Sequence, residues 1–349
     1  MPTLENALDS LLARHFTRFT PGAVLLVARE DEVLYLRGAG KANLDTGAAI
    51  TPDTTFRLAS VSKQFTAMCV HLLAQRGLLK FTDSIGLYFP ELAHFSEIRL
   101  LHLLNHTSGL PDFEEHIPEN QAAQLTDEHV LRITAAQPAL LFSPGNQYRY
   151  SNTGYVLLGL LVERVASINY ADFLLENIFE PLQMPHSILY QPEAAIPNRA
   201  MGYSRAAEDR FELSDQNIGT ATRGDGCIYT SAKDYLKWHR SLSSHPLFNI
   251  NNKLNKNIAT IDEAKSWRYG MGWFQAEDGN GTSELFHSGD TSGFTNLVMR
   301  LPHHNTVIAC FSNIAGNQVF LDDLLQVLSH FPELSPKSEL VKQLQQLTR

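Results

Sequence analysis

Ser60 and Lys63 stand three residues apart where a strand-like stretch gives way to an apolar helical pattern that stops at Gly77. On a helix these two side chains share a face, so the lysine amine can reach the serine hydroxyl. A serine becomes a good nucleophile when a base removes its proton, and burial near a helix start lowers the pKa of a lysine toward that role. The helix start also offers a backbone N–H to an oxyanion. Because a Ser-x-x-Lys is expected about once by chance in such a chain, the hypothesis needs partners elsewhere.

Tyr150 and Asn152 lie in a loop immediately before a second helical pattern at residues 154–166. From such a loop a phenol and an amide can reach the same cleft. The pKa of a phenol, near 10, falls beside a cation, which would let Tyr150 pass the serine proton to a leaving group. The alternative interpretation is a packed aromatic residue followed by Asn152 as the helix N-cap.

His287, Gly289 and Asp290 follow a predicted strand at residues 284–287. The glycine permits close backbone approach, so an acyl group could lie along the strand edge and meet the Asp290 N–H as a second oxyanion donor. His287 could hydrogen-bond Tyr150 or a substrate carboxylate. The alternative interpretation is a histidine in a turn at the strand end.

Other candidate groups carry less chemistry. His102 and His106 are four residues apart, as in helical metal sites, but no glutamate lies between them and residues 107–109 end the helix. There is no Gly-rich phosphate loop and no cysteine pair for zinc, so we expect no metal and no cofactor. An odd and sparse set of cysteines does not describe a disulfide framework, and three free thiols are expected: Cys69, Cys227 and Cys310.

The composition is that of a soluble globular protein. The 349 residues are 44% hydrophobic and 19% charged, with a formal net charge of −9 and no long run of Lys and Arg. That balance argues against nucleic acid or an anionic membrane as partner. Residues 1–16 form an amphipathic pattern rather than a signal peptide, and no segment reaches the roughly 18 apolar residues of a membrane span. We expect a cytoplasmic protein, or a periplasmic or secreted one if a signal peptide has been removed.

These residues need a scaffold of strands at both ends of the chain and helices in its middle. Hairpin strands are predicted at 23–28 and 32–37, helices at 98–104, 127–136, 154–166 and 170–179, strands again at 226–230, 269–276, 284–287, 295–301 and 306–312, and a closing helix at 320–331. Residues 301–305 would join the last two strands, and the polar segment 241–265 reads as a surface loop or lid. The sequence thus predicts an α+β fold in which residues 1–80 and 220–349 share one antiparallel sheet flanked by helices. Residues 81–219 are predicted to form an inserted all-helical domain.

The three motifs occur in the order typical of the penicillin-recognising serine hydrolases. The chain resembles the branch that contains class C β-lactamases, DD-carboxypeptidases, D-aminopeptidases and related esterases. The motif residues are Ser60 and Lys63, then Tyr150 and Asn152, then His287 and Gly289. Further segments that look like family signatures are 103–111, 144–159, 226–234 and 287–294.

This resemblance implies a catalytic cleft between the two domains and an acyl-enzyme mechanism. By analogy Ser60 is acylated, Lys63 and Tyr150 move protons, and Asn152 orients the substrate amide. The N–H groups of Ser60 and Asp290 would hold the oxyanion. The acyl-enzyme would then hydrolyse or pass its acyl group to another acceptor.

One departure narrows the substrate. The β-lactamases of this branch usually carry Lys in the third motif, whereas this chain has His287, which is mostly neutral near pH 7 and attracts a carboxylate less. We therefore expect peptidase, amidase or esterase activity on a small-molecule or peptide substrate. The alternatives are a true class C-like β-lactamase, a metal-dependent hydrolase, and a catalytically inactive binding protein on the same fold, although no motif residue is missing.

Overall fold

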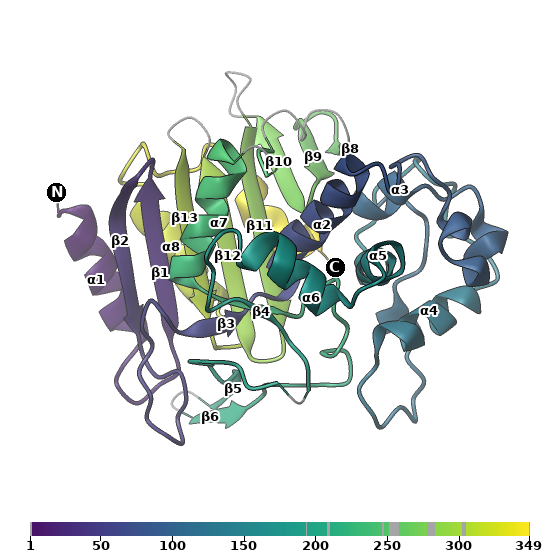
Figure 1. Cartoon of the computed structure of the whole chain (residues 1–349). Helices are drawn as coiled ribbons and strands as arrows, with labels where there is room; N and C mark the ends of the chain where they lie inside the picture. Colours follow the sequence, from purple (N-terminus) through teal and green to yellow (C-terminus); the bar gives the residue numbers. More distant parts are fainter. Residues whose placement is uncertain are drawn as a thin grey trace.

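The computed structural model describes residues 2–192, 194–207, 210–245, 248–250, 258–277, 283–301 and 305–348. Its main element is an eight-stranded antiparallel sheet of order β2-β1-β13-β12-β11-β10-β9-β8 (Figure 1). The strands are Ala23–Arg29 (β1), Glu32–Ala39 (β2), Ala259–Asp262 (β8), Trp267–Gly270 (β9), Trp273–Glu277 (β10), Ser283–Thr291 (β11), Phe294–Leu301 (β12) and Thr306–Ser312 (β13). Ala23 of β1 pairs with Ser312 of β13, so segments from the two ends of the chain share one antiparallel sheet, as predicted.

Helices cover both faces of the sheet. The central strands β12 and β13 are buried at every position, which is why their sequences are nearly continuous apolar and β-branched runs. Helix α7 (Ala232–Ser244) packs on β1 and β13, while α1 (Leu4–His15) packs with α8 (Gln318–Leu328). Figure 1 places α7 in front of the sheet and α8 behind it. Helix α2 (Lys63–Gln75) lies beside α7, with Phe65 stacked on Trp238 at 4.3 Å between ring centroids.

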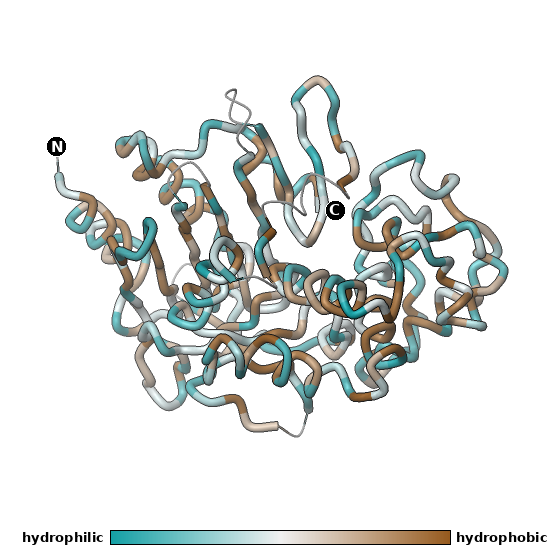
Figure 2. The backbone as a smooth tube through the Cα atoms, turned by 45° about the horizontal axis from the view of Figure 1, so that its top comes forward, coloured by the Kyte–Doolittle hydropathy of each residue, from teal (hydrophilic) through white to brown (hydrophobic). Residues whose placement is uncertain are grey.

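The outer helices are amphipathic and begin at polar caps. In α1 the side chain of Thr3 accepts a hydrogen bond from the Asn6 N–H at 3.2 Å, and Ser231 accepts one from the Asp234 N–H at the start of α7. Hydrophobic and hydrophilic residues alternate along the helical backbone in Figure 2, and the buried residues of α1 are Leu8, Leu11 and Leu12. Every helix in the described part of the chain is too short or too polar to cross a bilayer.

A helical segment follows α2 in the chain. Its helices are α3 (Leu100–Leu104), α4 (Asp127–Ala135), α5 (Asn152–Ala166) and α6 (Tyr170–Leu174), with one π-helical turn at Leu175–Phe179 (η5) and short 3₁₀ turns at Ile85–Leu87 (η2), Pro90–Phe95 (η3) and Phe113–His116 (η4). Helix α5 is buried over most of its length and contacts α2, α3, α4 and α6. Helix α5 is therefore the central helix of this segment.

The prediction of an all-helical segment over 81–219 is wrong in its last part. After residue 179 the chain forms strands β4 (Ile188–Leu189), β5 (Tyr203–Ala207) and β6 (Arg210–Leu213). Strand β4 joins β3 (Thr55–Arg57) and β7 (Ile228–Ser231) in a three-stranded sheet. These strands are short, and β4 is held by pairing with a distant segment, so local periodicity does not predict it. The division into two domains stays a prediction.

The predicted surface loop at 241–265 is also partly wrong. Helix α7 continues through Ser244, and β8 begins at Ala259. Residues 246–247 and 251–257 of this stretch lie outside the described residues, as do residues 302–304 of the predicted hairpin between β12 and β13.

The three cysteines are free thiols, as predicted, and all are buried. Cys227, which follows a turn in the sequence, lies in the core beside Arg57, whose guanidinium donates a hydrogen bond to Sγ at 3.2 Å. Burial nevertheless raises the pKa of the Cys227 thiol to about 12. A thiol in this environment is a structural side chain rather than a nucleophile.

A partly buried ion-pair network connects the loop between β6 and β7 to the helical segment. The Arg223 Nε donates to Asp127 Oδ2 at 2.6 Å, and its Nη1 donates to Glu163 Oε1 at 2.7 Å. Asp127, on α4, is 1% exposed, and burial raises its pKa to about 6 although Arg223 lowers it. The same loop places the Asp225 and Gly224 carbonyls on Lys63 and Thr66 of α2.

Substitution of Arg223 by methionine is expected to lower the free energy of unfolding by about 3 kcal/mol, because it leaves the buried Asp127 carboxylate without a cation. Urea unfolding at pH 7 measures this loss. The matched control is Arg210→Met, which breaks the exposed Arg210–Glu212 pair and should cost less than about 0.5 kcal/mol. Equal effects of the two substitutions would contradict this role for the network.

Candidate active site

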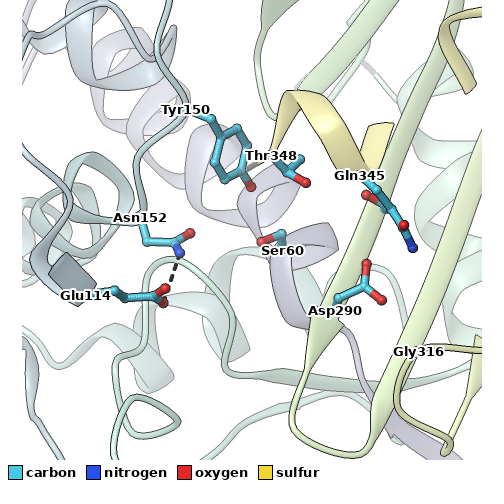
Figure 3. A pocket seen from close by; sticks show the side chains of 9 residues that line it. Ser60, Glu114, Tyr150, Asn152, Asp290, Gly316, Gln345 and Thr348 are labelled. Atoms are coloured by element: carbon cyan, nitrogen blue, oxygen red, sulfur yellow. Dashed lines mark hydrogen bonds between the residues drawn. The ribbon is translucent and has the colours of Figure 1, made fainter. Parts of the chain in front are cut away.

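A cavity of about 320 Å³ opens beside Ser60, and both the sheet and the helical segment contribute to its wall (Figure 3). The short 3₁₀ turn η1 (Ala59–Ser62) carries Ser60 into it, directly before α2. The other lining residues come from η4, the loop before α5 and its first residue, β11, the chain after β13, and the C-terminal helix α9 (Leu340–Leu347) with its C-cap. Its described lining residues are Ser60, Glu114, Tyr150, Asn152, Ser288, Asp290, Gly316, Gln345 and Thr348.

Lys63 meets Ser60 as predicted. Its Nζ lies 2.9 Å from Ser60 Oγ, 2.8 Å from Asn152 Oδ1 and 2.9 Å from the Asp225 carbonyl oxygen. The side chain is fully buried, and this burial lowers the pKa of Lys63 to about 8, although the Asp225 charge acts in the opposite direction. A lysine of this pKa is partly neutral near pH 7 to 8, so it can accept the serine proton.

The backbone around Ser60 is held by a close approach of two chain segments. Ala59 adopts a left-handed conformation with φ of 49°, which is costly for a residue with a side chain and marks a sharp turn into Ser60. On the facing strand, a Cβ at Gly289 would lie 2.2 Å from the Leu58 carbonyl oxygen. The close approach that Gly289 was predicted to allow is therefore the approach of η1 to β11.

Tyr150 lines the cavity next to Ser60, but its protonation differs from the prediction. Burial raises the pKa of Tyr150 well above its ordinary value, and the neighbouring Ser60 hydroxyl lowers it by less. Lys63 Nζ lies over the tyrosine ring, 5.1 Å from its centroid, and does not reverse this effect. No hydrogen bond of normal geometry reaches the Tyr150 hydroxyl from the described residues. The phenol therefore keeps its proton at neutral pH.

His106 holds the Tyr150 loop. Its ring stacks on the Tyr150 ring at 4.1 Å between centroids, and Nδ1 accepts the Ser151 N–H at 3.1 Å. Burial, together with the charge of Lys63, lowers the pKa of His106 well below its ordinary value, so the ring is neutral. Sequence reasoning considered His106 as a metal ligand and missed this positioning role. Among the described residues no group of three or more His, Cys, Asp and Glu side chains could hold a metal ion.

Asn152 connects Lys63 to the carboxylate of Glu114, a residue that the sequence motifs do not include. Its Oδ1 accepts from Lys63, and its Nδ2 donates to Glu114 Oε1 at 3.1 Å (Figure 3). The residue is the first of α5, and the N-cap is Ser151, so the alternative of Asn152 as a cap is wrong. The Asn152 backbone N–H donates to Asp112 Oδ2 at 2.5 Å, which fixes the helix start.

His287 lies behind the cavity wall and is absent from the described lining. Its Nε2 is 3.1 Å from the Tyr269 hydroxyl, and Nδ1 is 2.6 Å from the Ser288 carbonyl oxygen, so the predicted hydrogen bond with Tyr150 is replaced by one with Tyr269. Burial lowers the pKa of His287 to about 3, so it is neutral at physiological pH. Its neighbours on β11, Ser288 and Asp290, face the cavity instead.

Strand β11 presents part of one edge near Ser60. The last residue of β11 that pairs with β10 is Phe286, so residues 287–291 have no strand partner on that side within the described chain. On the other side they pair with β12, Gly289 with Asn296 and Asp290 with Thr295. An open edge of this kind can bind an extended acyl or peptide group by backbone hydrogen bonds.

The charged side chains in the described wall of the cavity are carboxylic acids, Glu114 and Asp290. Burial, the Asp112 carboxylate and Asp225 raise the pKa of Glu114 to about 7, and burial also raises the pKa of Asp112. None of the described lining residues is Lys or Arg, and Lys63 is enclosed by its three acceptors. No motif in the sequence signals Glu114, Gln345 or Thr348, since each is brought to Ser60 only by the fold.

Comparison with known families identifies the family of this chain. The Beta-lactamase family model matches residues 7–330. The chain belongs to the Beta-lactamase family. A penicillin-binding protein of Bacillus subtilis (strain 168) is 26% identical over 351 residues, which cover 94% of this chain and 75% of that protein. Protein flp of Staphylococcus aureus (strain MW2) is 27% identical over 329 residues, which cover 90% of this chain and 64% of flp.

Solved structures share the fold of this Beta-lactamase family member. The D-amino acid amidase of Ochrobactrum anthropi SV3, solved with D-phenylalanine, has a TM-score of 0.79 at 25% identity and covers 94% of this chain and 99% of that one. A penicillin-binding protein from Bacillus halodurans, at 22% identity, has a TM-score of 0.80 and covers 95% and 100% of the two chains. The predicted family and α+β fold are confirmed.

Proposed function

We propose that this Beta-lactamase family protein is a serine hydrolase that cleaves small aminoacyl amides or peptides with a free amino group. The observation that carries the proposal is the Glu114 carboxylate in the wall of the Ser60 cavity, hydrogen-bonded to Asn152. A carboxylate there suits a substrate ammonium group and repels a substrate carboxylate. The similarity to a D-amino acid amidase supports the same class of substrate.

The chemistry begins with transfer of the Ser60 proton to Lys63, whose amine is 2.9 Å away. Ser60 Oγ then bonds to the carbonyl carbon, and the Ser60 and Asp290 N–H groups are proposed to stabilise the oxyanion. As the bond to the leaving nitrogen breaks, the protonated Tyr150 donates to that nitrogen and is reprotonated at the expense of Lys63. Water then attacks the carbonyl carbon of the Ser60 ester and gives a proton to Lys63. As the ester bond breaks, Ser60 Oγ regains its proton from Lys63, and the free acid is released.

Carboxylate-bearing substrates fit this cavity poorly. Penicillins and D-Ala-D-Ala peptides carry a carboxylate, whereas His287 is neutral and withdrawn, and the described cavity wall contains acids without a basic side chain. The cavity therefore favours amidase or aminopeptidase activity over β-lactamase or carboxypeptidase activity. A panel of aminoacyl amides in both D and L forms, p-nitrophenyl esters, D-Ala-D-Ala peptides and nitrocefin tests this order of preference.

Substitution of Glu114 by glutamine is expected to lower kcat/KM for an aminoacyl amide by about 30-fold, mainly through KM, because the ammonium loses its ionic partner. The measurement belongs at pH 8, above the pKa of about 7, where Glu114 is mostly ionised. The same substitution should change hydrolysis of the corresponding N-acetylated substrate far less.

The matched control is Glu115→Gln, which alters the adjacent acid that pairs with Arg149 at 2.8 Å and does not line the cavity. It should leave both substrates unaffected. An equal loss on free and acetylated substrates in Glu114→Gln would reject ammonium recognition, and a wild-type preference for nitrocefin or D-Ala-D-Ala peptides would reject the proposed substrate class.

A further inference from the structure

Helix α9 reaches the active site from outside the family match. The Beta-lactamase family model ends at residue 330, and α9 begins ten residues later at Leu340. Nevertheless Gln345 and Thr348 line the Ser60 cavity. In Figure 3 Thr348 stands beside Tyr150, and Gln345 stands beside Asp290. One wall of the cavity is therefore supplied by a segment beyond the residues that define the family.

The helix is fixed in this position by specific contacts. Leu340, Val341 and Leu344 are buried, and α9 packs against β10 and β11. The Glu284 carboxylate on β11 is 5% exposed and accepts the backbone N–H groups of Lys337 and Ser338, each at 2.9 Å. A carboxylate that accepts these N–H groups ties the approach to α9 directly to the strand that carries Asp290.

A second cavity continues from the first one. It has a volume of about 190 Å³, lies between α8 and α9, and shares Ser288, Asp290 and Gln345 with the Ser60 cavity. Its described lining is mixed: aliphatic side chains, among them Leu321 and Leu325 from α8, stand beside a larger number of polar and charged ones. Gln345, which donates to Gln318 Oε1 at 2.5 Å, therefore stands where the two cavities meet.

The direction of a bound substrate follows from the proposed function, on which this inference rests. Glu114 and Asn152 lie on one side of Ser60 in Figure 3, and Asp290 and Gln345 lie on the other. An acyl group whose ammonium meets Glu114 thus sends its leaving group toward α9. We propose that α9 forms the leaving-group subsite, and that an apolar amine or amino acid residue beyond the scissile bond passes Gln345 into the groove between α8 and α9.

The test compares substrates with one acyl group and two leaving groups. Alanine amide releases ammonia, whereas alanyl-leucine amide releases leucine amide, and each is assayed with the alanine enantiomer that the wild-type enzyme prefers. Gln345→Trp narrows the passage between the two cavities. It is expected to lower the ratio of kcat/KM for alanyl-leucine amide to kcat/KM for alanine amide by about tenfold. The control Gln343→Trp lies on the same helix but lines neither cavity, and should leave that ratio unchanged. A ratio in Gln345→Trp within twofold of wild type overturns the proposal.

A second substitution covers failure of Gln345→Trp to fold. Leu325→Gln replaces one of the aliphatic lining residues by a polar one of similar length, and is expected to lower the same ratio by about threefold. Methyl acetate and isopentyl acetate form a parallel pair without an ammonium group. If aminoacyl amides are not hydrolysed, the proposed function fails while the ester pair still decides on α9. If neither Gln345→Trp nor Leu325→Gln changes the kcat/KM ratio for the ester pair or for the amide pair, the α9 proposal fails. Recognition of the substrate ammonium by Glu114 is then still supported by its own test.

Discussion

Substitution of Ser60 by alanine is expected to abolish the acyl-enzyme and to lower kcat/KM by about 10⁴-fold or more, since no covalent step remains. Ser60 lines the cavity, is 2.9 Å from a buried amine, and sits on a turn held by the left-handed Ala59. Intact-protein mass spectrometry after reaction with a fluorophosphonate measures the effect directly. Wild-type protein gains one adduct, and the variant gains none.

The choice of control matters because Ser288 also lines the cavity. Ser288→Ala removes that hydroxyl, and the adduct should still form on Ser60. Thermal unfolding shows whether each variant is folded before the adduct is sought. An adduct on folded Ser60→Ala protein, or its loss in Ser288→Ala alone, would assign the nucleophile to another residue.

Lys63 is expected to set the pH dependence of acylation. Its pKa is lowered to about 8, and only the neutral amine accepts the serine proton, so the acylation rate rises with pH and levels off above pH 8. Between pH 8 and pH 6 the rate should fall by about 50-fold, because the neutral fraction of Lys63 falls from about one half to about one in a hundred. A neutral ester is the appropriate substrate, because Glu114 also changes charge near pH 7 and would alter the binding of an amine.

Replacement of Lys63 by methionine should lower the acylation rate on that ester by about 10³-fold at pH 8 and remove the rise with pH. Methionine keeps the buried volume but leaves the Asp225 carbonyl and Asn152 Oδ1 without their donor. The conservative variant Lys63→Arg keeps a cation and loses the base, so it should be equally inactive yet more stable. A rise through pH 8 that persists in either variant would assign the base to another group.

The sequence predicts this site where the chemistry is local. Ser60 and Lys63 are one helical turn apart, so their spacing alone indicates contact, and Gly289 signals a close backbone approach. The sheet is predictable for a similar reason, because its central strands are long apolar runs. The short strand β4 escapes detection because only pairing with β7 stabilises it.

The rest of the site depends on tertiary packing. His287 occupies the first position of the third motif, but the pleat of β11 turns it to the buried side, where it hydrogen-bonds Tyr269 and is neutral. Glu114 reaches Asn152 from 38 residues away. The pKa of Tyr150 is raised because burial outweighs the effect of the neighbouring Ser60 hydroxyl, and no local sequence pattern indicates this balance.

Lys63 donates to Ser60, Asn152 and the Asp225 carbonyl, so the environment proposed to activate Ser60 depends on distant parts of the chain. Asn152 and Asp225 lie 89 and 162 residues further along the chain, so the amine acquires its surroundings only when distant segments have come together. In an incomplete chain Lys63 would be a solvated ammonium ion with the pKa of an ordinary lysine, and Ser60 an ordinary alcohol. The nascent polypeptide is therefore expected to be unreactive, and the proposed nucleophile, Ser60, is expected to form only in the completed fold.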